Sequence, residues 1–337
     1  MSSGILSWAV LGESITVSGI VGILSAASEA VGAKDVLWGL ATSMNTCSAR
    51  LHSEERKTAL IALLPSLVVF ALFTAYPVIY SLYLSFFDCS LLGGPRTFVG
   101  LGNYAKMFAN ADFRVSMANT VKYAVGTVPI GAALSMLAAV LLNQKIRGRG
   151  FYRVAYFMPV VTSMVAVAIV WTWMFDPYYG LFNALLEKMG INGPAWLADA
   201  RWSLPAVIIL GIWKNLGYNM VIFLAGLQDV PTEYYESAEI DGAGAWQKFR
   251  YVTMPLMRGS IGFVLIMSTI KSFQVFGQVY VMTGGGPMNS TMVLVYYIYR
   301  QAFEFYRSGY ASAVAWFLFA VILVLTILQK AFLKAEN

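Results

Sequence analysis

The sequence predicts an all-α, polytopic membrane protein with six core transmembrane helices, and two observations carry this prediction. Hydrophobic residues make up 58% of the 337 positions and charged residues only 12%, about half of the charged fraction that soluble domains carry. Several apolar stretches are also longer than the roughly 18 residues that indicate a transmembrane helix. The net charge of +6 therefore belongs to loops near lipid headgroups, and it does not indicate a nucleic-acid partner.

Six apolar segments of the chain are long enough to cross the bilayer as helices. They are residues 60–87, 119–142, 154–175, 204–227, 259–282 and 309–329. Lysines and arginines number twelve at one set of alternate ends and seven at the opposite set. Because positively charged loops stay on the cytoplasmic side of a membrane, we expect both termini to be cytoplasmic.

We expect the chain to have three parts. Residues 1–52 form an N-terminal extension, residues 53–118 hold the first span with an outer loop, and residues 119–337 form the helical core. The extension is rich in Gly and Ser and lacks the basic region that opens a signal peptide. A seventh span, an interfacial helix and a loosely ordered segment all remain open for it.

A polar segment at residues 231–257 separates the fourth and fifth spans. It predicts a short helix, a glycine break and a second short helix. Pro231 suits a first helical turn, and Gly242 suits the left-handed position at which a helix ends. Trp246 and Phe249 give the second helix an apolar edge, because residues three apart share a helix face. A plain solvated connector is the alternative, and the charge count places the segment in the cytoplasm.

The sequence does not indicate a metal site, a disulfide framework or a nucleotide-binding loop. Two cysteines and one histidine are too few for a disulfide framework or a histidine metal site. The glycine run at residues 283–287 is not followed by the Lys-Ser/Thr pair of a phosphate-binding loop. We therefore expect no catalytic residue, no metal ligand and no ATP hydrolysis within this chain.

Two lysines lie near the centres of the fourth and fifth predicted spans. These are Lys214 and Lys271, and none of the six spans contains Asp or Glu. A lysine at that depth costs about 2.5–3.5 kcal/mol, so each should face the bundle interior or a water-filled path. One reading is a structural lysine that snorkels or bonds backbone carbonyls. The other is a cation that meets an anionic substrate.

Side chains beside these lysines combine hydrogen-bonding groups with aromatic rings, which suits the hydroxyls and ring faces of a sugar. The same Ser, Asn and Gln side chains are equally suited to bonding helices to one another. They are Trp213, Asn215, Tyr218, Asn219, Ser272, Phe273, Gln274 and Gln278.

The polar segment resembles the EAA loop of bacterial ABC-importer permeases, with the pattern E-A-A-x3-G-x9-I-x-L-P. Every spacing of that pattern is kept, in Glu236, Ser237, Ala238, Gly242, Val252, Met254 and Pro255. The longer run AEIDGAGAWQKFRYVTMPLM and the runs FVGLGNY and VYVMTGGGP resemble the carbohydrate-uptake branch, whose members carry maltose, multiple sugars or glycerol phosphate. The resemblance covers about residues 58–330. We call residues 231–257 the coupling segment.

The resemblance implies a non-enzymatic, multi-pass subunit of the bacterial inner membrane, in contact with membrane lipid. Its implied partners are a second, homologous permease, two ATPase subunits that bind ATP and magnesium, and an extracytoplasmic solute-binding protein. This chain itself would need no cofactor. In such permeases the EAA helices dock in a groove of the ATPase, with the glutamate in polar contact and the glycine setting the angle. The implied coupling residues are Glu236, Ser237, Ala238, Asp241, Gly242, Trp246, Phe249 and Pro255.

In maltose-type relatives the sugar binds within the two spans that flank the EAA loop. The positions matching that pocket are Gly211, Asn215, Tyr218, Lys271, Ser272 and Val275. Together with the lysine argument, this predicts a substrate pathway formed by Trp213, Lys214, Asn215, Tyr218, Lys271, Ser272, Gln274 and Gln278.

The expected cargo is a carbohydrate, in particular an oligosaccharide. Two midplane lysines without a matching acid lead to a sharper hypothesis, an acidic cargo that bears uronate or phosphate, such as an alginate-type oligosaccharide. The competing class is a secondary transporter or channel with no ATPase partner. Carriers coupled to ions usually use intramembrane carboxylates, and the six spans have none.

Overall fold

The computed structural model describes residues 58, 61–144 and 146–335, and these residues are largely helical. The chain divides into two compact units, Met1–Pro77 and Val78–Asn337. In the first unit, the described residues form helix from residue 61 onward and include a π-helical turn, η1 (Ala71–Ala75). The predicted extension, residues 1–52, lies outside the described residues. All sites discussed below lie within the second unit.

Within the described residues, four helices are long and apolar enough to cross a membrane, and each overlaps a predicted span. Two further segments qualify only as pairs of helices with a sharp bend between them. The described residues thus form a mostly helical membrane protein with four to six candidate spans. The four long helices are Ile61–Ser85, which ends in α4 (Tyr76–Ser85), then α6 (Ala111–Asn143), α10 (Ser203–Gln228) and α17 (Ser308–Ala335).

Helix α6 begins eight residues before the predicted start at residue 119. The side-chain oxygen of Asn110 accepts hydrogen bonds from the backbone N–H groups of Asp112 (2.8 Å) and Phe113 (3.3 Å). Such a cap satisfies donors that the first turn of a helix leaves without partners. The cap therefore accounts for the extra turns.

The third predicted span, residues 154–175, is wrong as a continuous helix. Helix α7 (Arg149–Val161) and helix α8 (Met164–Met174) meet at an angle of 100°. Pro159 lies in the last turn of α7, where it removes one backbone donor and crowds the preceding turn. The chain is then extended at Thr162. A helix that ends within the span leaves carbonyl groups free.

The fifth predicted span, residues 259–282, is also interrupted. Helix α14 (Arg258–Phe273) is followed by Phe276, whose φ of −143° is not helical, and then by α15 (Gly277–Met282). The glycine that opens α15 lowers helix propensity at this point. At its other end, α14 meets the helical stretch Ala245–Leu256 at a bend of 71°.

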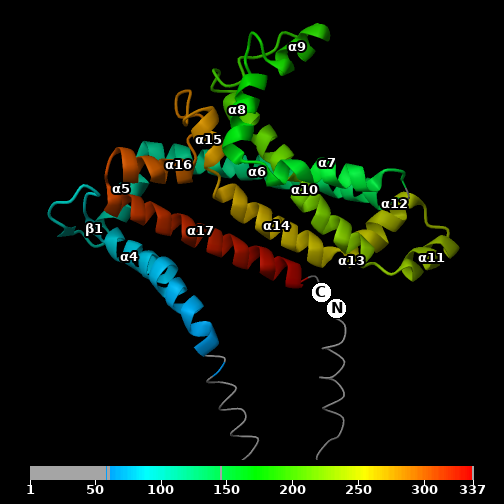
Figure 1. Ribbon diagram of the computed structural model, residues 1–337, viewed down its shortest axis with the longest axis horizontal. Helices are drawn as coiled ribbons and strands as arrows, with labels where there is room; N and C mark the ends of the chain where they lie inside the picture. The colour runs from blue at the N-terminus through cyan, green and yellow to red at the C-terminus, as the bar shows by residue number, and fades with distance from the viewer. Residues whose placement is uncertain (1–57, 59–60, 145, 336–337) are drawn as a thin grey trace, which may run out of the picture. The chain divides into compact units, whose positions relative to one another are not determined.

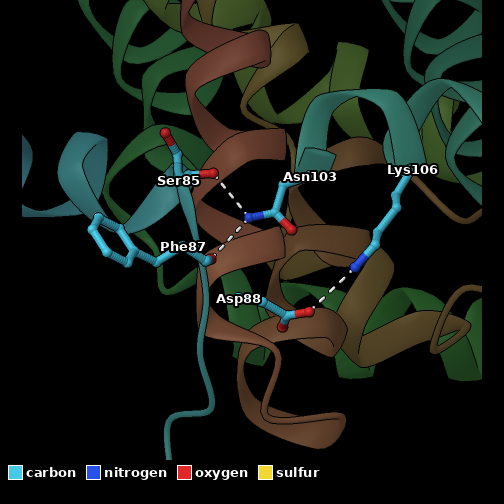
Figure 2. A network of polar contacts seen from close by, with 5 residues as sticks. All are labelled: Ser85, Phe87, Asp88, Asn103 and Lys106. Carbon is cyan, nitrogen blue, oxygen red and sulfur yellow. Dashed lines mark hydrogen bonds and ion pairs between the residues drawn. The ribbon is translucent and has the colours of Figure 1, made fainter. Parts of the chain in front are cut away.

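A polar network joins the end of α4 to the short helix α5 (Gly102–Ala109) in Figure 2. The Asn103 side chain donates to the backbone oxygens of Ser85 and Phe87, both at 2.9 Å. Nearby, Lys106 pairs with Asp88 at 3.2 Å. Between α4 and α5 lies a small antiparallel sheet of β1 (Phe87–Asp88) and β2 (Thr97–Phe98), with Phe87 opposite Phe98. The network fixes α5 at this end of the helix bundle.

Helices α6, α7 and α10 run together, and α14 runs beside α17 (Figure 1). A β-carbon on Gly217 of α10 would come within 1.9 Å of the Tyr156 carbonyl oxygen, so only glycine allows α10 to approach α7 this closely. Ser135 of α6 donates to the Leu216 carbonyl at 3.1 Å.

The remaining short helical elements outside the coupling segment are α9 (Leu181–Lys188), α16 (Leu294–Tyr299) and η3 (Arg300–Glu304).

The buried apolar side chains form two clusters along the bundle. The first cluster includes Tyr123 of α6, Leu210 of α10 and Phe273 of α14. The second cluster includes residues nearer the other end of the same three helices. Polar residues occupy the stretch between the clusters on each of these three helices. The members of the second cluster on these helices include Met136, Ala139, Met220, Phe223 and Val264.

Candidate coupling segment and substrate cavity

The coupling segment folds as the sequence predicts, into a helix, a glycine turn and a second helical stretch. Gly242 follows α11 (Thr232–Ile240) with a left-handed φ of +78°. Its N–H donates to the Glu239 carbonyl at 3.0 Å, and the N–H of Ala243 donates to the Ala238 carbonyl at 2.9 Å. These two bonds form a Schellman motif, which ends a helix and satisfies its last carbonyls.

Side-chain bonds hold the two halves of the coupling segment at a fixed angle. The Tyr235 hydroxyl lies 2.9 Å from the Thr253 hydroxyl, and Lys248 pairs with Glu239 at 2.5 Å. Both contacts join α11 to the second half of the segment. That half is continuous helix with a π-helical turn inside it, made of α12 (Ala245–Lys248), η2 (Phe249–Thr253) and α13 (Met254–Leu256).

Most of the predicted coupling residues are exposed in this chain. Glu236, Ser237, Asp241 and Gly242 are exposed, whereas Ala238 and Pro255 are partly covered. The Trp246 and Phe249 rings lie 5.7 Å apart, as their spacing predicts. A rigid, exposed helix pair is available to a partner, and the contact of these residues with an ATPase stays a prediction.

An apolar hollow of about 600 Å³ lies beside the coupling segment. Trp246 and Phe249 form one wall, and Met136, Val140 and Phe223 contribute to the others. The hollow connects the second half of the coupling segment to helices α6, α10 and α14.

A small polar cavity lies where α6, α10 and α14 meet, between the two apolar clusters (Figure 1 shows the three helices). Its open volume is about 40 Å³, which holds a few water molecules and no sugar ring. The side chains around it are hydroxyls, amides and one ammonium group, with no carboxylate among the described residues. The lining residues are Tyr123, Thr127, Gly131, Gly211, Ile212, Asn215, Asn219, Ser268, Lys271 and Ser272.

Lys271 is the single charged side chain that lines this cavity. Its Nζ atom lies 3.7 Å from the centre of the Tyr218 ring, which is a cation–π contact. Lys271 takes part in none of the ion pairs between described residues. The aromatic face therefore stabilises a positive charge that keeps its capacity to bind an anion.

The uncharged groups of the cavity are bonded across the helices. Ser272 lies 3.0 Å from the Thr127 hydroxyl, and Asn219 donates to the Ser268 hydroxyl at 3.3 Å. Asn215 donates to the carbonyl of Gly211 within its own helix at 2.9 Å. Three of the predicted pathway residues, Asn215, Lys271 and Ser272, thus meet in one cavity, and Tyr218 supports one of them.

Lys214 has a different environment from Lys271. It donates to the carbonyl oxygen of Pro159, to that of Thr162 at 2.7 Å and to the Thr162 hydroxyl at 3.2 Å. These are carbonyls that the break between α7 and α8 sets free. Such contacts match the structural reading of a carbonyl-bonded lysine, and Lys214 does not line the cavity.

The other predicted pathway residues are dispersed. The Trp213 ring packs on Trp171 with ring centres 5.2 Å apart. Gln278 is buried and donates to the Tyr123 hydroxyl, while Gln274 is exposed. None of these three side chains lines the cavity, and their part in transport stays a prediction.

The residues that α6 contributes to the cavity were not among those predicted from the sequence. Tyr123, Thr127 and Gly131 come from this helix and line one side of the cavity. A signal for them exists, since small and polar residues recur every three or four positions along the second span, which places them on one helix face. The stripe is Ser116, Thr120, Tyr123, Thr127, Gly131 and Ser135.

Residues 131–335 match the family described as binding-protein-dependent transport system inner membrane component. This chain belongs to that family, and the match covers more than half of its length. It is therefore an ABC-transporter permease subunit, a non-catalytic component, and ATP is hydrolysed by a separate subunit. The family excludes the competing class of secondary transporters or channels.

Named relatives are similar over nearly their whole length. The lactose transport system permease protein LacF of Rhizobium radiobacter is 37% identical, over 79% of this chain and 90% of its own. The sulfoquinovosyl glycerol transport system permease protein SmoG of Agrobacterium fabrum is 33% identical, over 84% of this chain and 92% of its own.

A solved structure shows the same fold. It is a bacterial ABC transporter involved in the import of the acidic polysaccharide alginate. One of its chains superposes with a TM-score of 0.73 at 24% sequence identity, over 85% of this chain and 99% of that chain. The fold of this protein is that of an ABC-transporter permease.

Proposed function

We propose that this chain is the permease of a carbohydrate importer and that its cargo passes the cavity between α6, α10 and α14. Two lines of support exist. Relatives that match over most of the chain are named for lactose, for trehalose and maltose, and for sulfoquinovosyl glycerol. The cavity itself presents hydroxyl, amide and aromatic groups, which are suited to a sugar.

The proposed topology has six spans, with both termini and the coupling segment in the cytoplasm of a bacterium and the core in its inner membrane. The four long helices and one span from each bent pair give six; in the second pair α14 belongs to the span, and Ala245–Leu256 stays with the cytoplasmic coupling segment. The excess of lysine and arginine at the end that carries the coupling segment supports the orientation. Residues 53–118 would then supply the first span and outer loop, ahead of a permease core at residues 119–337.

The proposed assembly pairs this chain with a second, homologous permease, two ATPase subunits and an extracytoplasmic solute-binding protein. The coupling segment would enter a groove of one ATPase subunit, which alone binds ATP and magnesium. Its exposure and its internal bonds support that role, since a helix pair that transmits force must keep its angle. Affinity purification of this chain should bring down the ATPase.

Within the carbohydrates, we propose an acidic cargo, such as an oligosaccharide that bears uronate or phosphate groups. The observation that carries this proposal is Lys271, a cation in a cavity whose described lining has no carboxylate. The ring of Tyr218 stabilises a positive charge on Lys271 without supplying a negative charge to compensate it. A carboxylate or phosphate would supply the missing charge.

Substitution of Lys271→Met tests the acidic cargo. In proteoliposomes that contain the whole transporter, uptake of an acidic oligosaccharide should fall at least tenfold, because a charged hydrogen bond contributes about 1.5–3 kcal/mol. Uptake of a neutral analogue, if it is carried, should change much less. Lys122→Met is the matched control, since Lys122 is exposed on α6 and does not line the cavity. Unchanged uptake of every acidic oligosaccharide by Lys271→Met would refute the proposal.

A further inference from the structure

Two arginines at the start of α7 form a cationic pair that has no counter-ion among the described residues. Arg149 and Arg153 are four residues apart and thus share one face of the helix. The ion pairs of the described residues are Lys106–Asp88, Lys248–Glu239 and Arg300–Glu304, and neither arginine takes part in them. Two positive charges therefore lie side by side without a carboxylate.

One neutral amide receives both guanidinium groups. Gln228 is the last residue of α10, and with its amide oxygen turned toward the arginines it accepts from Arg149 Nη2 at 2.7 Å and from Arg153 Nη2 at 2.9 Å. That orientation is assigned from the hydrogen-bond network. Arg149 also donates to the Asn143 side chain at 3.3 Å. These contacts orient the pair but leave its charge uncompensated.

The hydrogen-bonding capacity of the pair is also incomplete. The Nε atoms of Arg149 and Arg153 are buried and have no acceptor. A buried charged donor without an acceptor is costly, so such groups normally find a partner. The two side chains are partly exposed, so an oxyanion can reach the outer Nη groups of each guanidinium, while the buried Nε atoms lie beyond its reach. A phosphate group suits this planar, multi-donor arrangement best.

The residues beside the pair indicate the source of the phosphate. Phe151 and Val154 lie on the same helix with 74% and 66% of their surface exposed, and Tyr152 is exposed as well. In a membrane protein, exposed aromatic rings next to basic side chains lie at the level of the lipid headgroups. Basic pockets between helices at that level bind anionic headgroups.

We propose that Arg149, Arg153 and Gln228 bind the phosphate of an anionic phospholipid, with its acyl chain along the exposed apolar side of α7. The site is outside the substrate cavity and does not depend on the cargo. Gln228 lies three positions before the first residue of the coupling segment, and Arg149 begins the helix that packs on α10. A bound lipid would therefore hold the α7–α10 junction from which the coupling segment extends.

The test measures lipid binding to the whole purified transporter by native mass spectrometry. The protein is stripped of lipid and titrated with dioleoyl phosphatidylglycerol or, separately, dioleoyl phosphatidylcholine. Wild-type protein should bind phosphatidylglycerol preferentially. Arg149→Gln with Arg153→Gln should lower that affinity by about fivefold per arginine, while Arg149→Lys with Arg153→Lys should keep most of it. The matched control is Arg147→Gln, a neighbouring exposed arginine outside the pair, which should change binding by less than twofold.

Several results would overturn the proposal. They are equal affinity for the two lipids in the wild type, unchanged phosphatidylglycerol binding in the double Gln variant, or an equal loss in the Arg147→Gln control. Full displacement of phosphatidylglycerol by millimolar inorganic phosphate would assign the site to a soluble anion. Loss of the ATPase subunit from the double Gln variant with lipid binding unchanged would assign the pair to a protein contact. If the double Gln variant does not assemble, Arg153→Gln alone should show the fivefold loss, and unchanged binding by it also counts against the lipid.

Discussion

At the residue scale, Lys214 and Lys271 show what a sequence can and cannot predict. Their depth in the spans and the absence of intramembrane acids follow directly from the sequence. Their partners do not, because those partners are created by the fold. Lys214 binds carbonyls that exist only where α7 breaks near Pro159, and Lys271 lies against Tyr218 one helix away. Contacts between helices therefore distinguish a structural lysine from a functional lysine within a membrane span.

These different partners predict different costs for the same substitution. Lys214→Met should destabilise the protein by about 1–3 kcal/mol, because it leaves the Pro159 and Thr162 carbonyls at the helix break without a donor inside a membrane span. Lys271→Met removes one cation–π contact, which contributes about 0.5–2 kcal/mol, and also removes the cost of holding a charge within the membrane. Thermal unfolding of the purified transporter should thus show a clear loss for Lys214→Met and little or none for Lys271→Met. The reverse order would contradict the assignment of Lys214 as the structural lysine.

At the element scale, long straight helices could be predicted and breaks could not. Helices α6, α10 and α17 lie where apolar runs of sufficient length indicate them. The breaks after Val161 and Phe273 were missed because the apolar run continues through them, and hydrophobicity alone does not report a bend. The coupling segment was predicted well, since Gly242 and the spacing around it specify a turn locally.

The bend of the coupling segment gives a prediction at this scale. Gly242 has φ +78°, and a β-carbon there would have no atom within 4 Å, so Gly242→Val acts through backbone strain alone. That strain costs about 1–2 kcal/mol. We expect the variant transporter to assemble and hydrolyse ATP, but the sugar carried per ATP should fall several-fold in proteoliposomes.

Gly259→Val is the matched control for the bend. Gly259 lies in α14, likewise with no atom within 4 Å of a β-carbon, and its backbone is helical. Its ratio of transport to hydrolysis should stay at the wild-type value. Normal coupling in Gly242→Val would show that the left-handed turn does not set the angle that couples hydrolysis to transport.

At the scale of the whole molecule, the substrate cavity is assembled from three helices that are far apart in sequence. Tyr123, Asn215 and Lys271 belong to α6, α10 and α14, and the cavity that they line lies between the two apolar clusters. The sequence indicated two of these helices through their lysines. The polar stripe of α6 was not predicted to line a cavity, because small and polar residues also serve in ordinary helix packing.

The size of the cavity bears on how the molecule works. At about 40 Å³ it is too small for a sugar, so the proposed passage of cargo through it requires α6, α10 and α14 to separate. Nothing in the described residues forms a metal cluster that could supply work from within the chain. In this family, ATP is hydrolysed by a separate subunit. The coupling segment shares an apolar hollow with α6, α10 and α14, the three helices that would have to move.

The central claim is that this chain moves cargo with work from a partner ATPase. Uptake by proteoliposomes that contain the complete transporter tests it most directly. Cargo delivered by its binding protein on one side should accumulate only when ATP and magnesium are present on the side of the coupling segment. Proton or sodium gradients should neither replace ATP nor alter the rate. Accumulation driven by an ion gradient in the absence of ATP would contradict the claim that this chain moves cargo with work from a partner ATPase.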